Sequence, residues 1–136
     1  MYGPAGRLYV YFSYGMHWCA NIVCAGEGEC EAVLLRAGEP VEGIDLMQLN
    51  RPGITNDRLL AAGPARLAQA FGIDKSCNDA SVLRGGEFWC AEDDLTPKVR
   101  AGEVSQTVRI GLGPGRGDDI PWRFVVPGHP YASRRR

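Results

Sequence analysis

A group of tyrosines near the start of the chain offers the clearest chemistry in this sequence. Tyr9, Tyr11 and Tyr14 fall within six residues and precede Gly15, a residue typical of tight turns. Exposed aromatic rings can stack on nucleobases. Strands are also rich in aromatic residues, so two rings on one face could instead pack a core. Tyr14 fits the core alternative poorly, because a loop tip leaves a large ring exposed.

Two extended segments are expected to position these rings. Residues 8–13 alternate as a half-buried strand does, which places Tyr9 and Tyr11 together on one face. The opposite face carries the apolar residues Leu8, Val10 and Phe12. Residues 16–23 resume an extended pattern after the turn. The two segments therefore predict a hairpin with Tyr14 at its tip.

Further elements follow from local patterns. Residues 31–37 predict a third strand, buried through Val33 and through Leu34 or Leu35 depending on register. Pro40 suits the first turn of a helix that ends before Arg51, and Pro64 begins a short helix that Gly72 terminates. Later strands are predicted at 81–83, 88–91, 107–112 and 122–126.

Composition limits the class of protein. The 136 residues suit one domain, 45% are hydrophobic, and 18 glycines with 9 prolines predict many turns. Five cysteines and no signal-peptide pattern favour a reducing cytoplasm. No run approaches the roughly 20 apolar residues of a membrane span. The net charge of −1 gives no overall attraction to nucleic acid.

Other motifs have simpler explanations. His17 and Cys19 could form a base and a nucleophile, but small core thiols account better for the cysteines. No zinc-type spacing occurs, so no metal site is expected. The glycine-rich run 111–117 lacks the ending of a phosphate-binding loop and predicts a surface turn.

Charged residues leave two alternatives open. Glu39 could form a structural ion pair with Arg36 or line a pocket wall. The arginines at 134–136 could contact phosphates or form a charged tail.

Five segments, in order, resemble the alkyladenine (3-methyladenine) DNA glycosylase family. They are LYVYFSYGMHWCANIV at 8–23, AVLLRAGEP at 32–40, GPARLAQAFGI at 63–73, RIG at 109–111 and PWRFVVPGHPYAS at 121–133. The resemblance covers nearly the whole chain. It implies an α+β fold: a single domain over residues 1–136, with a curved, open barrel-like antiparallel sheet and a few short helices.

The resemblance also implies an activity. Members of the family hydrolyse the N-glycosidic bond of alkylated purines such as 3-methyladenine, in base excision repair, without metal or organic cofactor. The implied partner is double-stranded DNA that carries the lesion, bound by a monomer in the cytoplasm and not at a membrane. Such enzymes extrude the target nucleotide from the duplex at a cost of a few kcal/mol.

By resemblance, one group of residues contacts DNA. Tyr14 is the wedge inserted through the minor groove, and Met16 and His17 line the groove beside it. A phosphate contact is implied at a helix start, where backbone N–H groups are free, by Gly63, Pro64 and Arg66.

A second group forms the implied base pocket. Tyr11 stacks on the flipped purine, and Asn21 discriminates against the 2-amino group of guanine. Cys19 and Leu34 are pocket wall. Arg36 is the implied catalytic residue, which helps to position the attacking water.

The sequence departs from the family at the general base. In the family this is a glutamate in a Glu-Thr-Glu-Ala-Tyr-like motif upstream of the tyrosine hairpin, and the sequence contains no such motif. A carboxylate base contributes typically ~10²–10⁴-fold, and we do not expect Glu39 to replace it. We therefore expect a chain that lacks the family's N-terminal part. It is either a glycosylase whose complete form is the enzyme or a non-catalytic DNA-binding remnant.

Overall fold

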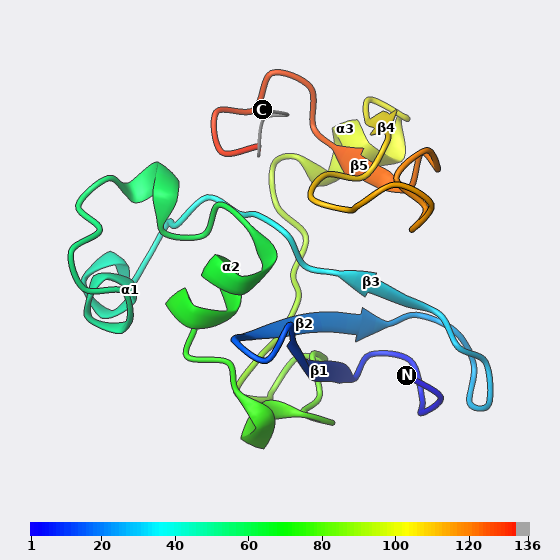
Figure 1. The fold of residues 1–136 in the computed structure, drawn as a ribbon, viewed down its shortest axis with the longest axis horizontal. Helices are drawn as coiled ribbons and strands as arrows, with labels where there is room; N and C mark the ends of the chain where they lie inside the picture. The colour runs from blue at the N-terminus through cyan, green and yellow to red at the C-terminus, as the bar shows by residue number, and fades with distance from the viewer. Residues whose placement is uncertain (133–136) are drawn as a thin grey trace. The chain divides into compact units, whose positions relative to one another are not determined.

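The computed structural model describes residues 1–132 and divides the chain into two compact units, Met1–Ala91 and Glu92–Arg136. Both units combine antiparallel strands with short helices, which confirms the α+β fold class (Figure 1). The strands form two open sheets, one in each unit. The arginines at 134–136 lie outside the described residues. The organisation of residues 1–136 as a single domain stays a prediction.

The first unit is built on a three-stranded sheet. β1 (Leu8–Ser13) pairs antiparallel with β2 (His17–Val23), and β2 pairs antiparallel with β3 (Ala32–Leu34). The predicted hairpin is therefore confirmed. The third strand is shorter than predicted, and Val33 is 57% exposed rather than buried. Its side chain lies on the outermost strand of the sheet, where little covers it.

One face of this sheet packs on the core of the first unit. Leu8, Val10 and Ala20 form a buried cluster with Ala68, Ile73 and Val82. Ala68 belongs to α2 (Pro64–Ala70), which lies beside β2 (Figure 1).

The end of the hairpin departs from the predicted burial. Phe12 was expected in the core but is 52% exposed and packs on Trp18, with ring centroids 4.7 Å apart. It adjoins the hairpin turn, beyond the residues of the buried cluster.

Helix α1 (Ile44–Asn50) begins later than predicted. It starts after Gly43, whose φ of 67° is left-handed, so Pro40 is not in its first turn. Only Asp45 lies in the favourable first turn of the helix dipole. The left-handed backbone of Gly43 determines where the helix starts. No pattern in the sequence indicates this start.

Helix α2 begins at Pro64 and ends before the positive-φ Gly72, as predicted. Its buried residues are Leu67, Ala68 and Ala70. Phe71 is 50% exposed, because it lies past the helix end.

A buried arginine joins these elements. Arg51 is 8% exposed, and its Nη1 donates to the carbonyl oxygen of Leu60 at 2.6 Å and to that of Leu59. Leu59 ends the short helix η1 (Asp57–Leu59), and Arg51 Nε donates to Gln69 Oε1 of α2 at 3.4 Å. Burial, with a smaller effect of the Arg66 charge, lowers the pKa of this guanidinium.

The second unit contains α3 (Thr96–Arg100) and the antiparallel pair β4 (Ser105–Thr107) and β5 (Arg123–Val125). Residues 111–117 form turns between the two strands, as predicted. Arg109 fixes this loop, since its Nη2 donates to the Arg116 carbonyl oxygen at 2.7 Å and its guanidinium lies 5.7 Å from the Trp122 ring.

Three predicted strands are not formed as expected, and the one at 81–83 is reduced to an isolated bridge at Ser81. The strand expected at 107–112 is displaced to 105–107, and residues 88–91 contain no strand.

Candidate functional site

Four of the residues predicted to form a base pocket share the sheet face opposite the core. The register aligns Tyr11 with Cys19 and Asn21 with both Tyr9 and Leu34. Directly opposed residues in an antiparallel pair project to the same side. We call this surface the tyrosine face, composed of Tyr9, Tyr11, Cys19, Asn21 and Leu34.

The buried amide on this face has a fixed orientation. Asn21 is 7% exposed, and its Nδ2 donates to the carbonyl oxygen of Tyr9 at 3.1 Å. A buried polar side chain normally requires such a partner. The bond fixes which way the amide group faces on the tyrosine face.

The two tyrosine rings lie together beside a buried thiol. The ring centroids of Tyr9 and Tyr11 are 5.7 Å apart with an interplanar angle of 26°. Burial, reinforced by the Cys19 thiol, raises the pKa of the Tyr11 hydroxyl. Burial also raises the pKa of Cys19, against a smaller opposing effect of its hydrogen bond with Tyr11. Both groups are therefore neutral near pH 7 and present hydroxyl and thiol hydrogens rather than charges.

The hairpin turn displays Tyr14 to solvent. Tyr14 and Gly15 have φ values of 51° and 64°, and Met16 N–H donates to the Ser13 carbonyl oxygen at 3.1 Å. Positive φ at both central residues is the requirement of a type I′ turn. Tyr14 is 72% exposed and Met16 67%. An unusual backbone conformation thus holds a large ring away from the core.

The predicted DNA-binding residues come from two elements that face a shared cavity. It has a volume of about 510 Å³ and is lined by Met16, His17 and Trp18 of the hairpin and by Ala65 and Gln69 of α2, among others. Ala65 lies next to Arg66, whose side chain is exposed, and α2 is capped by Gly63 and begins at Pro64. The hairpin and the start of α2 therefore border the same hollow.

Arg36 lies just beyond β3. Leu35 N–H donates to the Ala20 carbonyl oxygen at 2.9 Å, which continues the β2–β3 register by one residue. The same register extended by one residue would place Arg36 opposite Cys19, on the side of the tyrosine face. Ala37 then forms an isolated bridge with Ala62, so the backbone on both sides of Arg36 is held.

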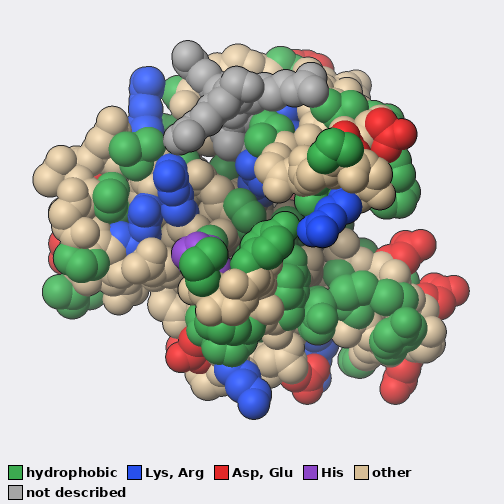
Figure 2. Space-filling view, in the orientation of Figure 1, with side chains coloured by type: hydrophobic (Ala, Val, Ile, Leu, Met, Phe, Trp, Pro, Cys, Tyr) green, Lys and Arg blue, Asp and Glu red, His purple; other side chains and the backbone are tan. Residues whose placement is uncertain are grey.

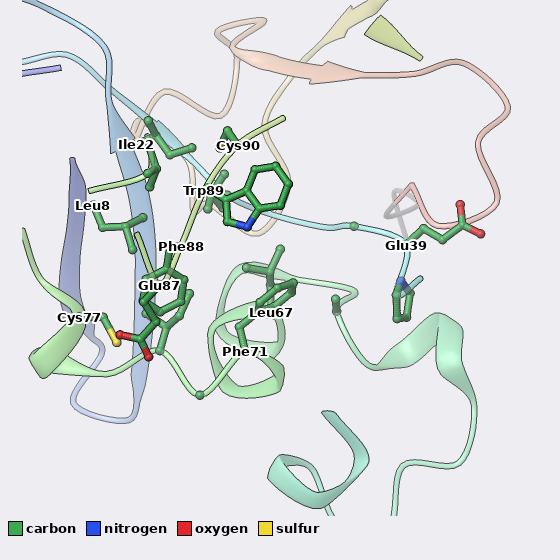
Figure 3. Close-up of a pocket in the computed structure, with 17 residues that line it drawn as sticks. Leu8, Ile22, Glu39, Leu67, Phe71, Cys77, Glu87, Phe88, Trp89 and Cys90 are labelled. Atoms are coloured by element: carbon green, nitrogen blue, oxygen red, sulfur yellow. The ribbon is translucent and has the colours of Figure 1, made fainter. Parts of the chain in front are cut away.

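A separate cavity of about 510 Å³ opens on the core side of the sheet. Leu8 and Ile22 of the sheet, Leu67 of α2 and Phe88 line it, and the Glu39 carboxylate at its rim points away from the labelled apolar side chains (Figure 3). Glu39 thus borders the core-side cavity, and both alternatives for this residue, an ion pair with Arg36 or a pocket wall, stay predictions.

Several apolar side chains besides Tyr14 are exposed, and hydrophobic surface is visible in the space-filling view (Figure 2).

Within residues 1–132, no helix is long and apolar enough to cross a membrane. In the same residues, no three or more His, Cys, Asp or Glu side chains come together in a way that could hold a metal ion.

Two residues of this region were missed in the sequence. Arg51 ties α1 to η1 and α2, and Asn78 bonds to β1 through its side chain. Both act over long sequence separations and carry no local motif.

The fold and the tyrosine face define a small α+β protein whose sheet carries two tyrosine rings and one buried amide on the same face. A model of the methylpurine-DNA glycosylase family matches residues 1–130. The chain belongs to this family, which confirms the resemblance seen in the sequence.

Curated relatives support the same assignment. Proteins provisionally named 3-methyladenine DNA glycosylase are 44% identical to this chain in Burkholderia lata over 98% of the chain, and in Methanoculleus marisnigri over 99%. Another, from Chlorobaculum parvum, is 44% identical over 100% of the chain. The chain spans 62% of the length of the first and last of these relatives and 68% of the second.

Proposed function

We propose that this chain carries the lesion-binding surface of a DNA glycosylase that flips alkylated purines of the 3-methyladenine type out of the duplex and hydrolyses their N-glycosidic bond. The observation that carries the proposal is the tyrosine face beside an exposed Tyr14. Flipping costs a few kcal/mol, and base–aromatic stacking returns ~1–3 kcal/mol per base. One hairpin therefore carries both a residue that can fill the gap in the duplex, Tyr14, and a ring that can stack on the flipped base, Tyr11.

The proposed roles follow the geometry of the hairpin. Tyr14 enters the minor groove and fills the gap left by the flipped nucleotide, with Met16 and His17 beside it. Tyr11 stacks on the extruded base. The exposed hairpin tip supports this division, since Tyr14 is 72% exposed while Tyr11 lies half-buried on the strand.

Selectivity is assigned to the polar groups of the tyrosine face. The Asn21 amide, oriented by its bond to Tyr9, opposes the 2-amino group of guanine. Cys19 and Leu34 form the pocket wall. A site with a fixed buried amide discriminates strongly, because the wrong base leaves polar groups unpaired.

Catalysis and backbone contacts complete the proposal. Arg36 helps to position the attacking water, supported by its register position beside the tyrosine face. Gly63, Pro64 and Arg66 at the start of α2 contact a phosphate of double-stranded DNA. The monomeric state and the cytoplasmic location stay predictions.

A second candidate is a chain that binds DNA without turnover. One observation favours it: Glu39, the carboxylate three residues after Arg36, lines the cavity that Leu8 and Ile22 border on the core side of the sheet. Without a carboxylate to orient and deprotonate the water, hydrolysis loses typically ~10²–10⁴-fold.

Single-turnover release of 3-methyladenine from methylated duplex DNA tests the proposal. Arg36→Ala should abolish release, whereas Arg58→Ala, an exposed arginine on η1, should not change it. Binding to the same duplex is measured in parallel. Binding without release favours the second candidate, and neither binding nor release overturns both.

A further inference from the structure

The outer edge of β1 is bordered by a segment from far along the chain. Leu8 N–H donates to the Ala80 carbonyl oxygen at 2.8 Å, and Val82 N–H donates to that of Gly6 at 2.9 Å. An isolated antiparallel bridge joins Arg7 and Ser81. These bonds share one register, so residues 80–82 act as a short edge strand along the beginning of β1.

The register shifts by one residue at Leu8, whose carbonyl oxygen accepts the Asp79 N–H at 2.8 Å, and at Val10 the bond to the neighbouring segment is made by a side chain. Val10 N–H donates to Asn78 Oδ1 at 2.9 Å. Asn78 N–H donates instead to the Lys75 carbonyl oxygen at 3.1 Å, at the end of η2 (Lys75–Cys77). Asp79, whose N–H still bonds to Leu8, has a φ of 70°, a left-handed backbone conformation at the point where the edge strand meets η2. The Asn78 amide thus replaces the missing backbone partner of Val10.

The group that Asn78 holds is the peptide between Tyr9 and Val10. The N–H of this peptide donates to Asn78, and its carbonyl oxygen accepts from Asn21 Nδ2 at 3.1 Å. A peptide group is planar, so a tilt of one end moves the other. Two asparagine side chains, 57 positions apart (78 minus 21), therefore hold opposite ends of one rigid unit.

This peptide group lies between the two tyrosines of the tyrosine face. It links Tyr9 to Val10, and the following residue is Tyr11, whose ring lies 5.7 Å from that of Tyr9. Val10 itself is 7% exposed in the core. The orientation of the peptide therefore sets both the acceptor that orients the Asn21 amide and the course of the strand between the two rings.

We propose that Asn78 is a positioning residue for lesion recognition: through the Tyr9–Val10 peptide it fixes the Asn21 amide. This inference rests on the proposed function. Hydrogen bonds that share one peptide reinforce each other, so loss of the Asn78 bond weakens the orientation of Asn21 as well.

The test is the affinity ratio of this chain for two duplexes. One carries 3-deaza-3-methyladenine, a lesion analogue with a stable glycosidic bond, and the other is undamaged. Asn78→Ala should lower the ratio by about tenfold, the order of one hydrogen bond, with undamaged binding unchanged. Asn78→Asp keeps an acceptor for Val10 N–H and should stay within about twofold of the wild type, the precision that separates one lost bond from none.

The matched control is Asn56→Ala. Asn56 Oδ1 also accepts a backbone N–H, that of Arg58, at 3.1 Å, but on η1. Its loss should lower stability similarly and leave the affinity ratio unchanged. In the double variant, Asn21→Ala with Asn78→Ala should give the ratio of Asn21→Ala alone, because one effect acts through the other.

Each outcome decides a different point. A wild-type chain without preference for the lesion duplex overturns the proposed function and the inference together. A wild-type preference that Asn78→Ala retains overturns the inference alone, as does loss of preference in Asn78→Asp or additive effects in the double variant. Unfolding of Asn78→Ala under assay conditions, seen by thermal melting, assigns Asn78 a structural role only and also overturns the inference.

Discussion

The Asn21 side chain donates to the Tyr9 carbonyl oxygen at 3.1 Å, between two residues that the β1–β2 register places opposite each other. Removal of this buried donor should destabilise the chain. Asn21→Ala is expected to lower the free energy of unfolding by about 1–3 kcal/mol, because a buried side chain and its hydrogen bond to Tyr9 are lost. Urea unfolding measures the change.

Asn50→Ala is the matched control for that experiment. Asn50 Nδ2 donates to the Ala70 carbonyl oxygen at the same distance, 3.1 Å, but the Asn50 side chain is exposed, so its removal leaves no cavity in the core. An Asn50→Ala loss as large as that of Asn21→Ala would contradict the importance of burial.

Tyr14→Ala should separate DNA binding from stability. The ring is 72% exposed, so its removal costs little folding energy, whereas loss of the wedge should weaken binding to lesion duplex about tenfold, within the range of one stacking contact. Fluorescence anisotropy with labelled duplex and a thermal melt give the two readouts. Tyr14→Phe keeps the ring and should bind as the wild type does; equal binding by all three proteins would argue against a wedge.

Arg51 should be among the most sensitive positions for stability. Arg51→Ala removes donors to two backbone carbonyl oxygens and to Gln69, and we expect a loss of about 3 kcal/mol or more from a buried charged network. Arg51→Lys cannot reproduce the planar fork and should rescue only part of it. Urea unfolding measures both, beside Arg58→Ala at a neighbouring exposed arginine, expected to change stability by less than about 0.5 kcal/mol. Similar losses at both arginines would refute this role.

Stability should fall at alkaline pH partly through Cys19. Burial raises the pKa of this thiol above its ordinary value of 9.0, so the folded state favours the neutral form. That contribution is complete below pH 9 and is lost as pH rises through the raised pKa. Tyr11 shifts in the same direction. Cys19→Ala should flatten the decline above pH 9 by less than about 1.4 kcal/mol per pH unit, the limit for one proton. Denaturant unfolding of both proteins across this range is the measurement, and parallel curves would exclude Cys19 as the source.

The sequence predicts those parts of the fold that local signals encode. Strand alternation gave the hairpin, and Pro64 with Gly72 gave α2. The tyrosine face followed from the alternation and the family resemblance together. The predicted start of α1 was wrong because it depends on the backbone conformation of Gly43. The predicted burial of Val33 was wrong because it depends on what covers the strand.

Hydrogen bonds between residues far apart in the sequence could not be predicted. Val10 and Asn78 are separated by 68 positions, and no pattern near either residue indicates that a side-chain amide completes the edge of β1. The left-handed backbone of Tyr14 was also unexpected, since non-glycine residues seldom adopt it.

Because of that left-handed backbone, selection for stability and selection for DNA binding should favour different residues at position 14. Asn and Gly adopt positive φ at lower cost than an aromatic residue, by ~1 kcal/mol or more. A library randomised at this codon and sorted for heat resistance should enrich Asn and Gly. The same library sorted on lesion-bearing DNA should return aromatic residues, and the gap between the two winners measures how much folding stability the chain gives up for recognition.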